Sequence, residues 1–447
     1  MTELRPTKPT ITPLAVKACT AQAARMCRTL YSETMDSVVF TGDSYPGDAR
    51  PKPLWCKSME AEHRNRPIPA YVIGVLSAAI VLTFSLLERQ IDGSASIFTD
   101  GYFHVGVAIG WIVCAGLIAL VVTRYLHIVA SVDEGPGLAV GYDALPILLL
   151  AAWVVMIAAL VTRHWLLAGV AAALGVYQLS ILVPRMIAAR VPRWAKQAPT
   201  LEIVVANVFI DNETPEDAAR QLVTTSADVV IVVESTSAFM TVFDNVGGKQ
   251  TYPYRVSDPD DDSDYAVTVV CKHEPGPRSQ MTTIGPLRLA LADVDVDGIS
   301  TLVVALNPMA TVDPGGHETW KEQIEALKEF VPTLAGPVII AGDLNTTRYR
   351  PEFEELLGLG LRDAIDALGK GLNPSFKLGA DGVLATVGAV ARLDHALVND
   401  CAFPLSVDNL EPCGSDHLPF KLRVAIRSSQ PGVEAIKSAG GSDGFNG

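Results

Sequence analysis

The chain has 447 residues, more than one ordinary domain needs, and 49% of them are hydrophobic. Charge is divided unevenly: residues 201–447 carry 18 Lys plus Arg against 36 Asp plus Glu, a net charge of −18, while the whole chain carries −14. Because proteins bind nucleic acids largely through cationic side chains at the phosphates, this acidity argues against a general binder of duplex DNA or RNA.

The first 69 residues show neither a helical nor a strand period, so we expect residues 1–69 to be a poorly ordered tail. The natural start is either Met1 or Met59, and the sequence leaves both open. No cleavable signal peptide is predicted, because the first apolar stretch lies too far from the N-terminus.

Four apolar segments follow, each near the length of about 20 residues that crosses a hydrocarbon core. None contains Lys, Arg, Asp or Glu, and they comprise residues 70–87, 102–123, 144–162 and 165–184. We expect four transmembrane helices, because so many uncharged segments in succession are hard to bury without lipid; helices of a large soluble core are the alternative.

The predicted location is the cell membrane, as a multi-pass protein. Basic residues are concentrated on the side of the membrane that holds both ends of a four-span bundle. The positive-inside rule therefore places both ends, and the domain after the spans, in the cytoplasm. If one of the four segments does not cross the membrane, that domain is extracytoplasmic instead.

A basic linker at 185–198 leads to a soluble region at 199–426, and the Gly- and Ser-rich residues 427–447 are expected to be disordered. Short β-branched runs in the soluble region predict strands. These runs are 201–209, 227–235, 265–271, 300–306, 336–345, 392–399 and 419–426. Helical patterns lie between several of them. The predicted fold class is α+β, with transmembrane helices followed by a two-sheet α/β sandwich.

Polar residues recur at the ends of these predicted strands. They are Asn207, Glu234, Asp343, Asn345, Asp394, Asp416 and His417. Any one of the Asn or Asp residues is explained as a turn former. Together, however, the carboxylates and amides supply hard oxygen ligands for Mg²⁺ or Mn²⁺, and the imidazole titrates near neutral pH. Hydrolysis of a phosphate ester needs such a set: a divalent ion, a base for water and donors for the phosphate oxygens. A zinc centre would need more His or Cys.

Five motifs occur in one order along the soluble region: "ANVF", "VVES", "AGDLNTT", "RLDHALV" and "GSDHLPF". They resemble the endonuclease/exonuclease/phosphatase family, also called the deoxyribonuclease I type. The resemblance covers roughly residues 199–426. The longer stretch "GDLNTTRYRPEFEELLGLGLRDA" is similar to the bacterial membrane-anchored branch, in which several N-terminal spans precede the catalytic domain.

The resemblance implies a role for each matching position. Glu234 would be the main metal ligand, with Asn207 beside it and Asp416 helping to hold the ion. Asp343 would orient or activate the attacking water, and Asn345 would donate a hydrogen bond to the phosphate.

The same resemblance makes His417 the general base or transition-state partner, with Asp394 fixing its tautomer. One position departs from the family, which usually has a His after the strand at 300–306 where this chain has Asn307. An amide donates a hydrogen bond but carries no positive charge, and loss of one such donor typically costs about 100- to 1000-fold in rate. A nearby loop residue, His317, is a candidate replacement.

The sequence therefore predicts a membrane-anchored phosphoesterase that needs Mg²⁺ or Mn²⁺. Its expected partners are membrane lipid and a phosphorylated substrate: a phospholipid, a lipid-linked phosphate or a small metabolite. The main alternative is a catalytically weak or silent membrane scaffold or regulator that keeps the fold and binds a phosphorylated ligand or protein, and Asn307 favours it. A membrane nuclease is the second alternative, against which the negative charge argues.

Overall fold

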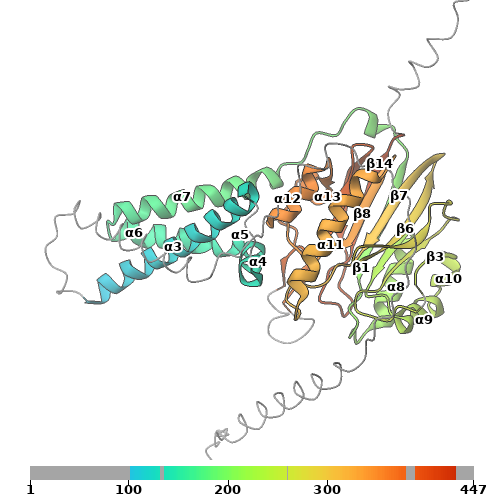
Figure 1. Ribbon diagram of the computed structural model, residues 1–447, viewed down its shortest axis with the longest axis horizontal. Helices are drawn as coiled ribbons and strands as arrows, with labels where there is room; N and C mark the ends of the chain where they lie inside the picture. The colour runs from blue at the N-terminus through green and yellow to red at the C-terminus, as the bar shows by residue number, and fades with distance from the viewer. Residues whose placement is uncertain (1–100, 131–134, 259, 379–387, 429–447) are drawn as a thin grey trace, which may run out of the picture. The chain divides into compact units, whose positions relative to one another are not determined.

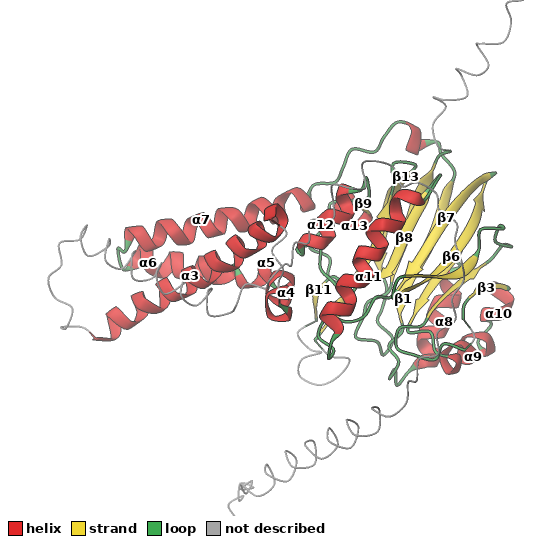
Figure 2. Cartoon of the chain, in the orientation of Figure 1, coloured by secondary structure: helices red, strands yellow, loops and turns green. Residues whose placement is uncertain are grey.

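The computed structural model describes residues 101–130, 135–258, 260–378 and 388–428. The predicted tail at 1–69, the predicted span at 70–87 and residues 429–447 of the predicted C-terminal tail lie outside these ranges. Apolar helices come first in the described chain, and an α/β domain with helices on the outer faces of two sheets follows (Figures 1 and 2).

The apolar helices are α3 (Gly101–Ala130), α4 (Pro136–Asp143), α5 (Leu145–Leu148), α6 (Leu150–Val161) and α7 (Trp165–Leu182). Two segments, Val105–Ile128 and Trp165–Met186, are long and apolar enough to cross a membrane. A third candidate combines Pro136–Asp143 with Leu145–Val161, and this pair is bent by 68°. The described residues thus contain two or three candidate spans, and the predicted span at 144–162 is divided between α5 and α6.

The bend between α4 and α5 has a local cause. Pro146 lacks the N–H that would donate to the carbonyl four residues earlier, so the helix cannot continue unbroken through this point. The amide of Gln178 then joins the helices around the bend: its Nε2 donates to Pro146 O at 2.6 Å, and its Oε1 accepts from Trp153 Nε1 at 2.6 Å. This buried amide is therefore paired within the helix bundle.

The first sheet of the α/β domain has the strand order β13-β14-β1-β2-β4-β3, in which only β1 and β2 are parallel neighbours. Its strands are β1 (Thr200–Asn207), β2 (Val229–Val233), β3 (Tyr254–Val256), β4 (Val267–Cys271), β13 (Ala402–Asn409) and β14 (Phe420–Ile426). Helices α8 (Pro215–Thr225), α9 (Ser237–Asn245) and α10 (Gly248–Thr251) connect strands of this sheet.

The second sheet has the order β5-β6-β7-β8-β12-β9, with β7 and β8 as its parallel pair. Its strands are β5 (Gln280–Ile284), β6 (Leu287–Val296), β7 (Ile299–Leu306), β8 (Val338–Asp343), β9 (Arg362–Asp363) and β12 (Asp394–Val398). The helices of this half are α11 (Gly316–Phe330), α12 (Pro351–Gly358) and α13 (Ala364–Ala367), and β10 (Phe376–Lys377) pairs with β11 (Ala389–Ala391).

Alternation along buried strands builds the layers. On β2, Val229, Ile231 and Val233 belong to the core between the two sheets, whereas Val230 and Val232 pack with residues of α8 and α9 on the outer face. Residues of α11 and α12 cover the outer face of the second sheet in the same way. The predicted fold class is confirmed, and each of the predicted strands is present.

Candidate functional site

The two parallel strand pairs carry polar residues to one edge of the sandwich. Asn207 ends β1 and Glu234 follows β2 in the first sheet, while Asn307 follows β7 and Asp343 ends β8 in the second. The antiparallel neighbours begin at the same edge: Asp394, the first residue of β12, pairs in register with Asp343. The Asp416–His417 pair lies just before β14, whose Phe420 pairs with Val205 of β1. The strand order thus explains why residues far apart in sequence meet.

An amide lies between two carboxylates in this site. Asn207 Nδ2 donates to Glu234 Oε1 at 2.8 Å and to Asp343 Oδ2 at 3.1 Å. Its Oδ1 accepts from Phe209 N at 3.0 Å, which fixes the orientation of the amide. Glu234 Oε2 accepts from Ile210 N at 2.7 Å, and Glu234 has a left-handed backbone with φ of 59°. Such a conformation is uncommon for a non-glycine residue and turns the side chain at the strand end towards the cluster.

An imidazole and its carboxylate form the other half of the site. His417 Nδ1 lies 2.8 Å from Asp394 Oδ2, which also accepts from Ser375 Oγ at 2.6 Å. His417 Nε2 points towards Asp343 Oδ2 at 3.6 Å. The ring packs at 5.0 Å from the ring of Phe376. Held by Asp394, the imidazole presents its second nitrogen to the carboxylate cluster.

The titration of these groups reflects burial and mutual charge. Burial raises the pKa of Glu234 to about 7 and that of Asp343 to about 6. Burial opposes a charge on His417, but the neighbouring carboxylates Asp394 and Asp343 outweigh it and raise the pKa of the imidazole to about 10. The pKa of Asp394 is lowered: burial disfavours its charge, and the charge and hydrogen bond of His417 overcome that effect. The site thus concentrates negative charge that a cation would stabilise.

The donor set fits a hard divalent cation. Asp343, Asp394 and His417 each offer a ligand atom within 4.8 Å of the others, which makes them a candidate metal-binding group. Asp416 is half-buried, its Oδ1 is buried and accepts no hydrogen bond from the described residues, and burial raises its pKa. Carboxylate oxygens are the ligands that Mg²⁺ and Mn²⁺ prefer.

The two amides on the second-sheet side bond to each other and to the backbone. Asn307 Nδ2 donates to Asp264 O at 2.9 Å, and Asn345 Nδ2 donates to Pro308 O at 2.9 Å and Asn307 Oδ1 at 3.4 Å. Both protons of the Asn345 amide are thus directed at residues 307–308. The candidate replacement His317 was predicted to lie in a loop. That prediction is wrong, because His317 is buried in the first turn of α11.

Two serines in the site were missing from the predicted set. Ser375 donates to Asp394, as described above, and no motif surrounds it. Ser415 Oγ donates to Asn207 O at 2.8 Å and accepts from His417 N at 3.0 Å, so it joins the two halves of the site. Ser415 belongs to the motif "GSDHLPF", so its position next to Asp416 was the available signal.

Residues 204–417 match the family model described as Endonuclease/Exonuclease/phosphatase family. The chain carries an endonuclease/exonuclease/phosphatase family domain. All the predicted site residues fall within the matched range. The match does not distinguish the membrane-anchored branch of this family, which therefore stays a prediction. No curated protein matches the chain significantly.

Solved structures of low sequence identity are similar to this endonuclease/exonuclease/phosphatase family domain. D. rerio TDP2 complexed with a single-strand DNA product is 19% identical, covering 50% of this chain and 98% of that one, with a TM-score of 0.42. Sphingomyelinase C from Streptomyces griseocarneus is 17% identical, covering 51% and 100%, with a TM-score of 0.39. A beta toxin mutant from Staphylococcus aureus with bound magnesium ions is 17% identical, covering 51% and 99%, with a TM-score of 0.36.

Proposed function

We propose that the protein is a membrane-anchored phosphoesterase that needs Mg²⁺ or Mn²⁺ and hydrolyses a phospholipid, a lipid-linked phosphate or a small phosphorylated molecule. One observation carries the proposal: the buried His417–Asp394 pair presents the free edge of its imidazole to Asp343, 3.6 Å away, beside Asn207 and Glu234. A base held by one carboxylate and facing others is suited to activating water next to a phosphate.

The residues divide the work as follows. Glu234, Asn207 and Asp416 would hold the cation, which would neutralise phosphate charge. Asp394 and His417 also belong to the candidate metal-binding group, but they bond to each other and would not be its ligands. Asp343 orients the attacking water by accepting its hydrogen bond.

His417 exchanges the proton through Nε2, and Asp394 keeps Nδ1 protonated through its 2.8 Å contact. Because the carboxylates raise the pKa of His417 to about 10, the imidazole acts as a base only when their charge is neutralised; otherwise it acts as an acid.

The position of two arginines supports a cytoplasmic domain. Arg124 near the end of α3 and Arg185 after α7 both contact Glu354 Oε1 of α12, at 3.6 and 3.3 Å. The C-terminal ends of α3 and α7 therefore lie on the side of the membrane that holds the α/β domain, and both of these ends carry positive charge. By the positive-inside rule we propose that this side is the cytoplasm. A reporter fused after residue 427 tests this, since activity of a fused alkaline phosphatase would contradict it.

A lipid or small-molecule substrate suits the charge of the domain better than duplex DNA. The excess of acidic residues after position 200 opposes binding to a long polyanion, whereas a substrate at the membrane surface is brought close by the anchor itself.

A second candidate function is a scaffold or regulator that binds a phosphorylated ligand without turning it over. The amides of Asn307 and Asn345 favour this candidate, because they bond to each other and to the backbone, as described above. Neither amide proton of Asn345 faces the carboxylate cluster, and Asn307 carries no positive charge against a phosphate.

A hydrolysis assay on the full-length protein in detergent separates these functions. The substrates are a soluble phosphodiester, a phosphomonoester, phospholipid vesicles and plasmid DNA, each with Mg²⁺ or Mn²⁺. We expect hydrolysis of a non-nucleic-acid substrate, lowered at least about 100-fold by Glu234→Gln. The control is Glu216→Gln, an exposed carboxylate that pairs with Arg220.

If the unmodified protein and Glu234→Gln have the same activity on every substrate, the phosphoesterase function is rejected and the scaffold function remains. Hydrolysis of plasmid DNA alone would identify a nuclease.

A further inference from the structure

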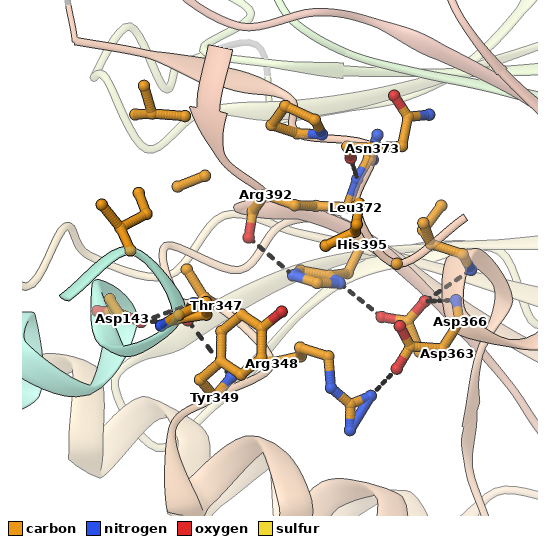
Figure 3. Close-up of a pocket in the computed structure, with 17 residues that line it drawn as sticks. Asp143, Thr347, Arg348, Tyr349, Asp363, Asp366, Leu372, Asn373, Arg392 and His395 are labelled. Atoms are coloured by element: carbon orange, nitrogen blue, oxygen red, sulfur yellow. Dashed lines mark hydrogen bonds and ion pairs between the residues drawn. The ribbon is translucent and has the colours of Figure 1, made fainter. Parts of the chain in front are cut away.

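The carboxylate of Asp143, at the bend between α4 and α5, contacts the α/β domain (Figure 3). It belongs to the wall of a cavity of about 160 Å³ to which Ile147 of α5 and His395 of β12 also contribute. None of Glu234, Asp343 or His417 lines this cavity. The contact is therefore separate from the carboxylate cluster, and it joins the apolar helices to the catalytic domain.

Both oxygens of Asp143 contact the loop between β8 and α12, one through two hydrogen bonds and the other through a hydrogen bond and an ion pair. Oδ1 accepts from Thr347 N at 2.8 Å and from Thr347 Oγ1 at 2.9 Å. Oδ2 accepts from Arg350 Nε at 2.8 Å and lies 2.8 Å from Arg350 Nη2. Charge-assisted bonds of this kind are short and directional, so one side chain of the helical segment fixes the conformation of this loop.

Arg350 is a buried cation that needs this carboxylate. Its side chain is 0% exposed and lies 4.5 Å from the centre of the Trp320 ring. Among the described residues, Asp143 is the one carboxylate found in an ion pair with it. Asp143 is 20% exposed, but removing it leaves the buried guanidinium without a counter-charge, which is unfavourable.

The same arginine connects the two loops that follow β7 and β8. Arg350 Nη2 donates to Thr311 Oγ1 at 3.0 Å, and Thr311 lies four residues after Asn307. Thr347 lies two residues after Asn345. Asp143 thus contacts Thr347 and Arg350, and Arg350 contacts Thr311. One carboxylate of the apolar helices is in this way connected to both loops that bear the site amides.

We propose that Asp143 is a positioning residue that holds the loops after β7 and β8 in their active arrangement, so that the membrane helices are part of what builds the site. The proposal rests on the proposed phosphoesterase function for its kinetic consequence. Asp143 acts through Arg350 and Thr347 and does not touch substrate. A displacement of about 1 Å in groups that position a substrate is enough to lower a rate about 100-fold.

The test uses the full-length protein in detergent with Asp143→Asn, and with Asp400→Asn as the matched control, because Asp400 is 81% exposed and 3.9 Å from its arginine partner. Hydrogen exchange reads the loop without requiring activity. We expect the amides of residues 345–350 to exchange at least about fivefold faster in Asp143→Asn. The amides of β2 should be unchanged, and Asp400→Asn should match the unmodified protein.

Kinetics supplies the second readout. For a soluble phosphodiester, kcat should fall about 10- to 100-fold in Asp143→Asn with KM unchanged. The double variant Asp143→Asn/Arg350→Gln lacks the buried charge, so its free energy of unfolding should be higher than that of Asp143→Asn. Its kcat should stay low, because the carboxylate that holds the loop is still missing. A double variant that regains full kcat would show that Asp143 only balances charge.

Unchanged exchange at 345–350 in Asp143→Asn overturns the proposal, whether or not the protein hydrolyses anything. If Asp143→Asn fails to fold, Thr347→Val replaces it, since that variant removes the hydroxyl donor without unpairing a charge. An unmodified protein that shows no hydrolysis refutes the proposed function, and the exchange result still decides the role of Asp143.

Discussion

Two Asp–His pairs lie on opposite faces of the same strand, and we propose a catalytic role for only one of them. His417 pairs with Asp394 at 2.8 Å on the edge between the sheets, and His395 pairs with Asp363 at 2.7 Å on the outer face. Both imidazoles are buried, at 5% and 2% exposure. The residue types, the distances and the burial are therefore nearly the same.

The difference is what the second ring nitrogen meets. His395 Nε2 is held by Arg392 O at 3.1 Å, and its ring packs at 4.6 Å from Phe353. His417 Nε2 instead faces Asp343 across 3.6 Å, longer than a hydrogen bond. Both ring nitrogens of His395 are thus engaged, whereas Nε2 of His417 faces a polar cluster, where we propose that it transfers a proton.

The largest expected contrast is between His417→Gln and His395→Gln. We expect His417→Gln to lower kcat per folded molecule about 100- to 10,000-fold, because a general acid or base is lost. His395→Gln should lower the folded fraction but not the rate per folded molecule. Steady-state kinetics and thermal unfolding of both full-length variants measure this. Equal losses of kcat per folded molecule would remove the distinction between the pairs.

Asp363→Asn should destabilise the protein by roughly 3 kcal/mol, because it replaces the buried carboxylate that bonds to His395 Nδ1 at 2.7 Å. It also weakens the cap of α13, where Asp363 Oδ1 accepts from Ile365 N at 2.6 Å and Asp366 N at 3.2 Å. Denaturant unfolding measures the change. A decrease in the free energy of unfolding of less than about 0.5 kcal/mol, which is typical of a surface substitution, would show that the pair contributes little.

The same aspartate predicts a pH dependence of unfolding. Burial opposes its charge, but His395, Arg348 and the backbone amide of Ile365 outweigh burial and lower the pKa of Asp363. A depressed folded pKa stabilises the protein above the unfolded pKa of about 3.9, and this stabilisation is lost as the pH falls from there through the folded pKa. The free energies of unfolding of the unmodified protein and of Asp363→Asn should be measured from about pH 7 to about pH 3. They should approach each other as the pH falls below about 3.9. A constant gap between them would contradict this.

The smallest expected effect is that of Ser375→Ala. Its hydroxyl donates to Asp394 Oδ2 at 2.6 Å. Among the described residues, Asp363 is bonded by His395 and by the backbone amides of Ile365 and Asp366, and not by a hydroxyl. Loss of one hydrogen bond of about 1 kcal/mol should lower kcat about fivefold. A rate equal to that of the unmodified protein would show that His417 alone is sufficient to hold Asp394.

Sequence patterns predicted most strands of the sandwich, and the strands that they did not predict were missed for physical reasons. The strand β13 contains Pro404, which interrupts a strand pattern and is accommodated here at the edge of the sheet with a bulge. The strand β6 includes Asp293, which looks like a loop residue but is buried and paired with Arg278 at 2.7 Å. Both misleading signals come from tertiary contacts that a single strand does not contain.

The candidate site was more predictable than the contacts that support it. The motif "RLDHALV" indicates Asp394 as a site residue, and the structure brings Asp394 to His417. The contact of Asp143 with Arg350 joins residues 207 positions apart. No local pattern could signal it, because Asp143 precedes an apolar segment and Arg350 reads as an ordinary charged loop residue.

The most direct test of the central claim, that the carboxylates beside His417 hold a divalent cation, is the binding of Mn²⁺ to the full-length protein followed by electron paramagnetic resonance. The account predicts saturable binding that Mg²⁺ displaces, retained in His395→Gln and lost in Glu234→Gln. Binding of Mn²⁺ by Glu234→Gln with the affinity of the unmodified protein would contradict it.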